Sequence, residues 1–170
     1  MPVHAYKGIM PAIAGTAYIA ETAVVIGDVR IGPDSGIWPG CILRGDVNDI
    51  KIGSRTNIQD ASVIHVSSTL QGTYIGDGVT VGHMALLHAC TIGDRAFIGM
   101  KACVMDGAIV EEEAMLGAGS LVPSGKVVGR HELWIGSPAR FKRKLTKEEI
   151  KFLYESAERY VRLSKNYMQP

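Results

Sequence analysis

The sequence has little of what marks a membrane-bound, secreted or nucleic-acid-binding protein. No apolar run reaches the roughly 18 residues of a membrane-spanning helix. The formal net charge is +1 at pH 7, too small to favour nucleic acid or an anionic membrane as a partner. The N-terminal segment lacks a basic stretch followed by an apolar block, so it does not predict a secretory signal. We therefore expect a single-domain cytoplasmic protein.

Cysteine is also scarce. Cys41, Cys90 and Cys103 are the three cysteines, and no two of them have the CxxC spacing of a redox or zinc motif. This pattern favours reduced, small core residues over a disulfide framework or a thiolate metal site.

A six-residue apolar repeat dominates what remains. The residue four positions after most members of the repeat is small or β-branched, and glycine often follows a member directly. This period suits neither an amphipathic helix nor a hairpin meander, but it suits short strands joined by tight corners in a solenoid. The repeat consists of Ile13, Ile19, Val25, Ile31, Ile37, Leu43, Ile52, Ile58, Ile64, Ile75, Val81, Leu87, Ile92, Ile98, Val104, Val110, Leu116 and Val122.

The breaks in this repeat show how it is grouped. They follow Leu43, Ile64 and Leu87, and each break comes after the third member of a group of three. A solenoid tolerates insertions at one corner, because the stacked sides stay in register. We therefore predict a triangular parallel β-helix of about six coils over residues 1–125.

The pattern changes after the repeat. Residues 126–145 are expected to form a crossover segment, in which the basic stretch from Arg140 to Lys144 faces solvent. Thr146 and Glu149 fit a capping box, and helical apolar spacing follows them. We predict that residues 146–170 contain a helix packed along one side of the prism, within the same domain.

The phase of the repeat brings three residues of the third side into one outward column. Arg44, His65 and His88 each directly follow a third-side member, so they occupy consecutive rungs about 4.8 Å apart. Two imidazoles one rung apart can share a metal ion, since Zn–N bonds are about 2.0–2.1 Å long.

A third histidine lies on another face. His83 and Asp60 occupy neighbouring rungs of the second side, and side chains on two faces of a prism diverge. We therefore expect His83 to reach the ion from a neighbouring prism, which gives three equivalent sites around a three-fold axis. Three neutral nitrogens leave a fourth tetrahedral position for water, as in catalytic zinc sites. His4 and His131 are interpreted as ordinary surface residues.

These residues resemble a known signature. The segment Arg44–Asp46, the pair Gln59 and Asp60, and the histidines at positions 65, 83 and 88 are similar to the γ-class carbonic anhydrase family, above all to its short bacterial members. The resemblance implies a left-handed β-helix that forms a homotrimer. It implies zinc, or in some members iron or cobalt, bound between subunits by His65 and His88 of one chain and His83 of the next. The implied reaction is the reversible hydration of CO2 to bicarbonate by metal-bound hydroxide.

The resemblance also implies roles for four further residues. Gln59 would hydrogen-bond the metal-bound water. Arg44 and Asp60 would form a salt bridge between subunits, and Asp46 would belong to the same interface network. A purely structural role in the trimer remains an equal alternative for Arg44, Asp46 and Asp60.

The chain departs from the archetype of the class in its acidic residues. Val47 stands where the archetype has a glutamate, and the loop from Val66 to Gly72 carries no carboxylate to shuttle protons. The family's tyrosine near the site would be Tyr160 or Tyr167. The sequence thus predicts the metal site without a carboxylate for rapid proton transfer.

Three other functions fit parts of the sequence. A hexapeptide-repeat acyltransferase would use a coenzyme A thioester and one histidine as general base, without a metal. Residues 135–139 resemble a stretch found in those enzymes. Three histidines with ligand spacing nevertheless argue against the acyltransferase hypothesis. A metal-dependent thioesterase would use the metal-bound hydroxide to attack a thioester instead of CO2. A metal-binding structural trimer would have little turnover.

Overall fold

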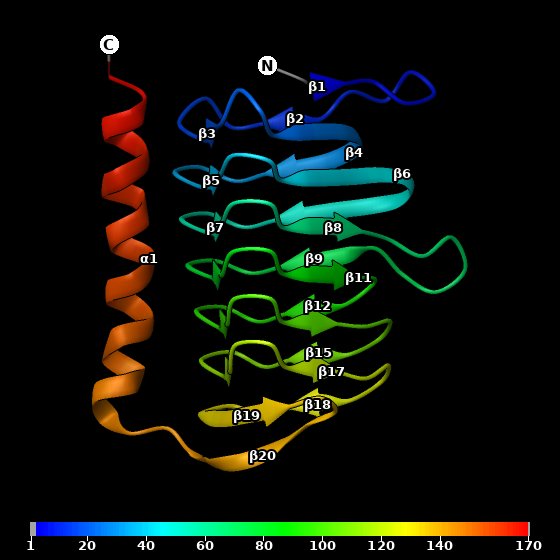
Figure 1. The fold of residues 1–170 in the computed structure, drawn as a ribbon. Helices are drawn as coiled ribbons and strands as arrows, with labels where there is room; N and C mark the ends of the chain where they lie inside the picture. The colour runs from blue at the N-terminus through cyan, green and yellow to red at the C-terminus, as the bar shows by residue number, and fades with distance from the viewer. Residues whose placement is uncertain (1–2, 170) are drawn as a thin grey trace.

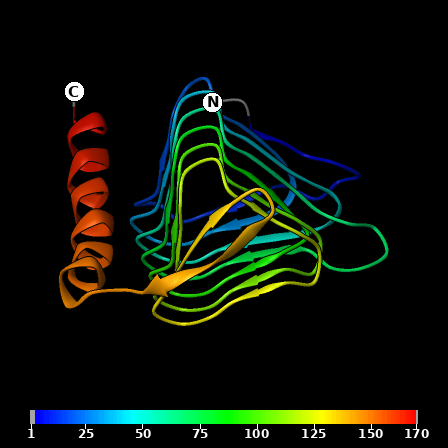
Figure 2. The ribbon, with the colours of Figure 1, turned by 60° about the horizontal axis from the view of Figure 1, so that its bottom comes forward.

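The computed structural model describes residues 3–169 as a parallel β-solenoid of about seven turns with one helix, α1 (Lys147–Tyr167), beside it (Figure 1). Viewed obliquely from its end, the solenoid is triangular in outline (Figure 2). The helix runs back along the stack, so its C-terminal end lies at the same end of the solenoid as β1 (Val3–His4) (Figure 1). The predicted triangular parallel β-helix with a C-terminal helix is confirmed, and its left-handed sense stays a prediction.

Short strands stack in register on the three sides of the prism. The first side has β2 (Ala12–Ile13), β9 (Thr73–Ile75), β12 (Thr91–Ile92), β15 (Ile109–Val110) and β18 (Val127–Val128). The second side has β3 (Tyr18–Ile19), β5 (Gly36–Ile37), β7 (Asn57–Ile58), β10 (Thr80–Val81), β13 (Phe97–Ile98), β16 (Met115–Leu116) and β19 (Glu132–Gly136). The third side has β8 (Val63–His65), β11 (Leu86–His88), β14 (Cys103–Val104) and β17 (Leu121–Val122). Two longer strands, β4 (Val24–Ile31) and β6 (Ile42–Ile52), bend from the third side into the first side of the next coil, and β1 (Val3–His4) pairs with β4.

The apolar repeat forms the core, as predicted. Ile64 pairs with Leu43 on one side and Leu87 on the other, and all three are fully buried. Stacking of like residues at each rung therefore fills the interior of the prism. Cys41 and Cys90 are buried and Cys103 is half-buried, all as free thiols. Burial raises the pKa of Cys41 to about 11, which fits a core residue and not a reactive thiolate.

The solenoid extends further than the sequence predicts. Within residues 126–145, β18 pairs with β15 and β19 pairs with β16, so these residues complete a seventh turn instead of simply crossing to the helix. β19 then pairs antiparallel with β20 (Ala139–Lys144), and this hairpin covers the end of the core. The basic stretch from Arg140 to Lys144 is exposed, as expected.

Helix α1 covers the second side of the prism. The predicted capping box is present, with Thr146 accepting from the Glu149 backbone N–H and the Glu149 carboxylate accepting from the Thr146 N–H. The helix contacts β3, β5, β7 and β10, and it buries Leu153, Ala157 and Val161 against them. No helix within residues 3–169 is long and apolar enough to cross a membrane.

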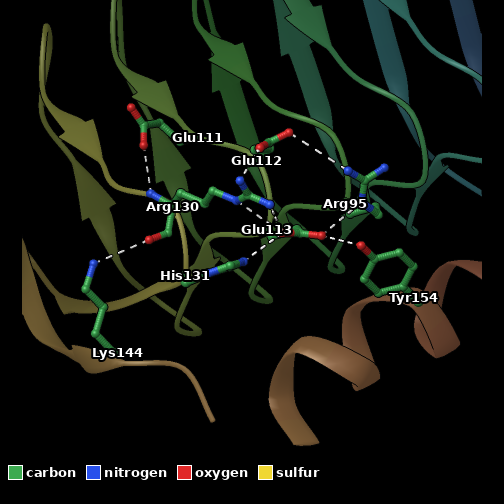
Figure 3. Close-up of polar contacts among 8 residues, drawn as sticks. All are labelled: Arg95, Glu111, Glu112, Glu113, Arg130, His131, Lys144 and Tyr154. Atoms are coloured by element: carbon green, nitrogen blue, oxygen red, sulfur yellow. Dashed lines mark hydrogen bonds and ion pairs between the residues drawn. The ribbon is translucent and has the colours of Figure 1, made fainter. Parts of the chain in front are cut away.

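A buried carboxylate ties the helix and the end of the solenoid together (Figure 3). Glu113, at a corner of the prism, is 4% exposed. It accepts hydrogen bonds from Arg95 Nε at 3.3 Å, Arg130 Nη2 at 2.8 Å and His131 Nε2 at 2.7 Å, and from the hydroxyl of Tyr154 on α1. One side chain thus links two coils, the last turn and the helix.

Candidate metal site

His65 and His88 stack at the ends of β8 and β11, as the phase of the repeat predicts. They are register partners, with ring centroids 5.1 Å apart. His65 Nδ1 lies 3.2 Å from His88 Nε2. Arg44 is in the same column, because Leu43 before it pairs with Ile64 before His65.

Each of these two rings also contacts a carboxylate. His65 Nε2 is 3.0 Å from Asp46 Oδ1, and His88 Nδ1 is 2.6 Å from Asp106 Oδ1. An ionised carboxylate only accepts hydrogen bonds, so the ring nitrogen beside it carries the proton. In neutral rings, the nitrogens that face each other, His65 Nδ1 and His88 Nε2, are then the two without a proton.

Two facing lone pairs repel each other unless a proton or a metal cation lies between them. Nitrogen ligands about 2.0–2.1 Å from a tetrahedral zinc ion lie roughly 3.3 Å from one another. The observed separation of 3.2 Å is close to that value. The donor set on this face therefore fits a bound metal ion.

Asp46 is also held by Arg44, whose guanidinium donates to its second carboxylate oxygen. Burial alone would raise the pKa of Asp46. Hydrogen bonds from His65 and Arg44, together with the charge of Arg44, outweigh burial and lower that pKa below its usual value. Asp46 is therefore an ionised acceptor for His65 at neutral pH.

His83 forms the second half of the candidate site, at the end of the second side. Its Nδ1 lies 2.9 Å from Asp60 Oδ2, which leaves Nε2 to face outward as a possible ligand. Gln59 lies next to Asp60 and is 5% exposed. Gln59 Nε2 donates to Asn57 Oδ1 at 3.0 Å, and Asn57 Nδ2 donates to Thr80 Oγ1 at 3.0 Å.

The two halves do not meet within one chain. Among residues 3–169, no three His, Cys, Asp or Glu side chains come together to hold a metal ion. Arg44 pairs with Asp46, and Asp60 pairs with His83, so the expected pairing of Arg44 with Asp60 between subunits stays a prediction.

Exposed apolar side chains lie on the same strands and rungs as both halves. Met84 is 51% exposed beside His83, and Leu86 is 37% exposed in the strand that ends at His88. Ile42 and Met100 on neighbouring rungs are also exposed. Large exposed apolar side chains in a cluster mark a surface suited to association.

The structure distinguishes the two tyrosines named as site candidates. Burial, and then the negative charge of Asp60, raise the pKa of Tyr160. Tyr167 is 61% exposed and packs on Tyr18 and Trp38. Tyr160 is therefore the better candidate, and its role stays a prediction.

Two site residues were missed by the sequence analysis. Asp106 lies 18 residues, or one uninterrupted coil, after His88, and that spacing was the available signal. Asn57 stands directly before a core position and is buried, where a polar side chain needs partners. The sequence alone does not reveal the hydrogen-bond partner of either side chain.

Comparisons with known proteins agree with the residue pattern. No protein-family model matches the chain. "Probable carbonic anhydrase" from Methanocaldococcus jannaschii is 44% identical, and the match covers 89% of this chain and 95% of that protein. The chain belongs to the γ-class carbonic anhydrase family. "Gamma carbonic anhydrase 2, mitochondrial" from Arabidopsis thaliana is 50% identical over 91% of this chain, which spans only 57% of that relative's length.

A solved structure shows the same fold under a different functional name. A hexapeptide transferase family protein from Anaplasma phagocytophilum is 50% identical and has a TM-score of 0.94, with 98% of each chain covered. Membership in the γ-class carbonic anhydrase family thus does not by itself decide the reaction. The cytoplasmic location expected from the sequence also stays a prediction.

Proposed function

We propose that this chain is a zinc-dependent carbonic anhydrase that interconverts CO2 and bicarbonate as a homotrimer. The observation that carries the proposal is the pair of facing ring nitrogens, His65 Nδ1 and His88 Nε2, which lie 3.2 Å apart. In each ring, the other nitrogen contacts an aspartate carboxylate. Such a pair suits a cation better than it suits a general base.

The proposed ligands are His65 and His88 of one subunit and His83 of the next. His83 faces outward on a different side of the prism, so a neighbouring chain offers the simplest way to complete the set. Zinc is the proposed metal, with iron or cobalt as alternatives. When bound by three histidines, it supplies Lewis-acid activation of water near neutral pH.

The side chains of this protein would then orient the reactants. Gln59 is fixed through its Nε2 by Asn57, so its Oε1 is the end left to accept a hydrogen bond from the reacting water. Asp46 and Asp60 hold two of the rings by hydrogen bonds. Proton release to solvent would not use position 47 or the loop from Val66 to Gly72, which lack a carboxylate.

The proposed trimer also accounts for the exposed apolar residues. Leu86 and Ile42 flank the half-site of His65 and His88, while Met84 and Met100 flank His83. If the third side of one prism packs on the next prism where His83 ends the second side, the exposed apolar residues beside both half-sites become buried. Burial of these apolar groups would contribute to association.

The runner-up is an acyltransferase acting on a coenzyme A thioester, which the name of the Anaplasma relative supports. A transferase of that kind needs one histidine as a general base. Here three histidines each pair with a carboxylate, and two direct their remaining nitrogens at each other. This arrangement favours the metal-dependent reaction over acyl transfer. Two other candidate functions, a metal-dependent thioesterase and a low-activity structural trimer, would use the same metal site.

Metal analysis and stopped-flow CO2 hydration test the proposal. Protein purified without chelators should hold about one zinc ion per subunit, and His88→Ala should lose both metal and activity. His4→Ala, which changes an exposed histidine outside the site, should keep both. Metal-loaded protein that shows no hydration above background would overturn the proposed reaction. Acyl transfer by metal-free protein would establish the runner-up.

A further inference from the structure

All three proposed ligand histidines contact an aspartate. Asp46 and Asp60, which contact His65 and His83, belong to the residue pattern that identifies the family. The third aspartate, Asp106, contacts His88 and lies outside that pattern. Its contact, at 2.6 Å, is the shortest of the three.

The fold sets this contact in advance. Asp106 lies just after β14, one coil beyond His88, where the corner of the stack places its side chain against the ring. Backbone hydrogen bonds fix the corner on both sides, from Gly107 N to Ala89 O at 2.7 Å and from Gly125 N to Asp106 O at 2.9 Å. The side chains of His88 and Asp106 are 29% and 33% exposed, so the contact is partly shielded from water.

We propose that Asp106 is a positioning residue, which holds His88 with its proton on Nδ1 and turns Nε2 toward His65. The use of that nitrogen as a ligand rests on the proposed function. Carboxylates that hold the far nitrogen of a ligand histidine fix its tautomer and raise its basicity, and their loss typically lowers metal affinity about 10–100-fold.

Zinc affinity of the full-length protein, measured by competition with a chromophoric chelator, tests this role. Asp106→Ala should weaken zinc binding about 10–100-fold. Asp106→Asn keeps an oxygen that can accept from Nδ1–H, so its loss should be smaller. Asp94→Ala is the matched control, because its carboxylate accepts from the Asp77 backbone N–H at a corner away from the histidines. The control should bind zinc with unchanged affinity, and an unchanged affinity in Asp106→Ala would overturn the proposal.

A second measurement does not need a metal or a variant. In metal-free wild-type protein with ¹⁵N-labelled histidine, NMR should show neutral His88 protonated at Nδ1. Protonation at Nε2 would overturn the role of Asp106, even if the Asp106 variants fail to fold. If the wild type binds no zinc, the proposed function fails, whereas the tautomer still decides whether Asp106 orients His88.

Discussion

The buried carboxylate of Glu113 should contribute strongly to stability at neutral pH, and Glu113→Gln is the change that tests this (Figure 3). Burial alone would raise the pKa of Glu113, but hydrogen bonds from Tyr154, Arg130 and His131 and the charge of Arg130 lower it from 4.5 to about 2. A pKa lowered by about 2.5 corresponds to about 3 kcal/mol, because each pH unit is worth about 1.4 kcal/mol. The variant should therefore lose about 3 kcal/mol of unfolding free energy at pH 7.

The pH dependence has a definite sign. Because the pKa of Glu113 is lower in the folded than in the unfolded state, the carboxylate stabilises the fold fully above about pH 4.5. That stabilisation declines as the pH falls from about 4.5 toward about 2, where wild-type Glu113 becomes neutral like the glutamine. The stability difference between wild type and Glu113→Gln should therefore be smaller at about pH 3.5 than at pH 7.

Urea unfolding followed by circular dichroism, at fixed subunit concentration, measures both effects. Glu112→Gln is the matched control, since the Glu112 side chain is 43% exposed and pairs with Arg130 at 3.0 Å. An exposed ion pair contributes at most about 1 kcal/mol. A loss in Glu113→Gln no larger than in Glu112→Gln would refute the reasoning, as would a loss that does not change with pH.

Two further substitutions test the stacking of the coils and the start of the helix. Gly99→Ala would place a Cβ 2.5 Å from the Ala118 backbone N and 2.6 Å from the Gly117 backbone C, so thermal unfolding should show a loss of about 1–3 kcal/mol. Gly15→Ala, where a Cβ meets nothing within 4 Å, should have little effect, and equal losses would contradict the close approach of the coils. Thr146→Ala removes the oxygen that accepts from Glu149 N at 3.2 Å and should cost about 1 kcal/mol in urea, whereas an unchanged midpoint would show that the cap does not stabilise α1.

The fold was predictable because one short period controls both burial and stacking. Ile64 and Leu87 are buried partners because each occupies the inward position of the same side. The residue after each must then point outward on adjacent rungs, which is how the sequence alone placed His65 above His88. The same phase placed His83 beside Asp60.

The last turn was missed because one residue masks it. Lys126 occupies a position that is small or β-branched in earlier coils, which breaks the visible repeat before β18. Val128, one coil after Val110, nevertheless continues the apolar series and is fully buried. The antiparallel hairpin that follows has no six-residue period, so periodicity could not reveal it.

The polar partners were only partly predictable. Glu113 resembles an ordinary corner glutamate in the sequence, and its burial depends on the helix and the last turn packing over it. Asp106 likewise depends on the side chain of one coil reaching back to the previous one. Such contacts depend on side-chain direction at the corners, which the repeat does not encode.

Mixed trimers test the proposed metal site between subunits most directly. His83→Ala and His88→Ala chains, each unable to bind zinc alone, would be unfolded together, refolded together and analysed for zinc. If the site takes His65 and His88 from one chain and His83 from the next, each mixed trimer contains one interface with all three ligands. Mixing is expected to restore zinc binding, together with CO2 hydration by the restored sites. Mixed trimers that bind no zinc would contradict a site shared between subunits.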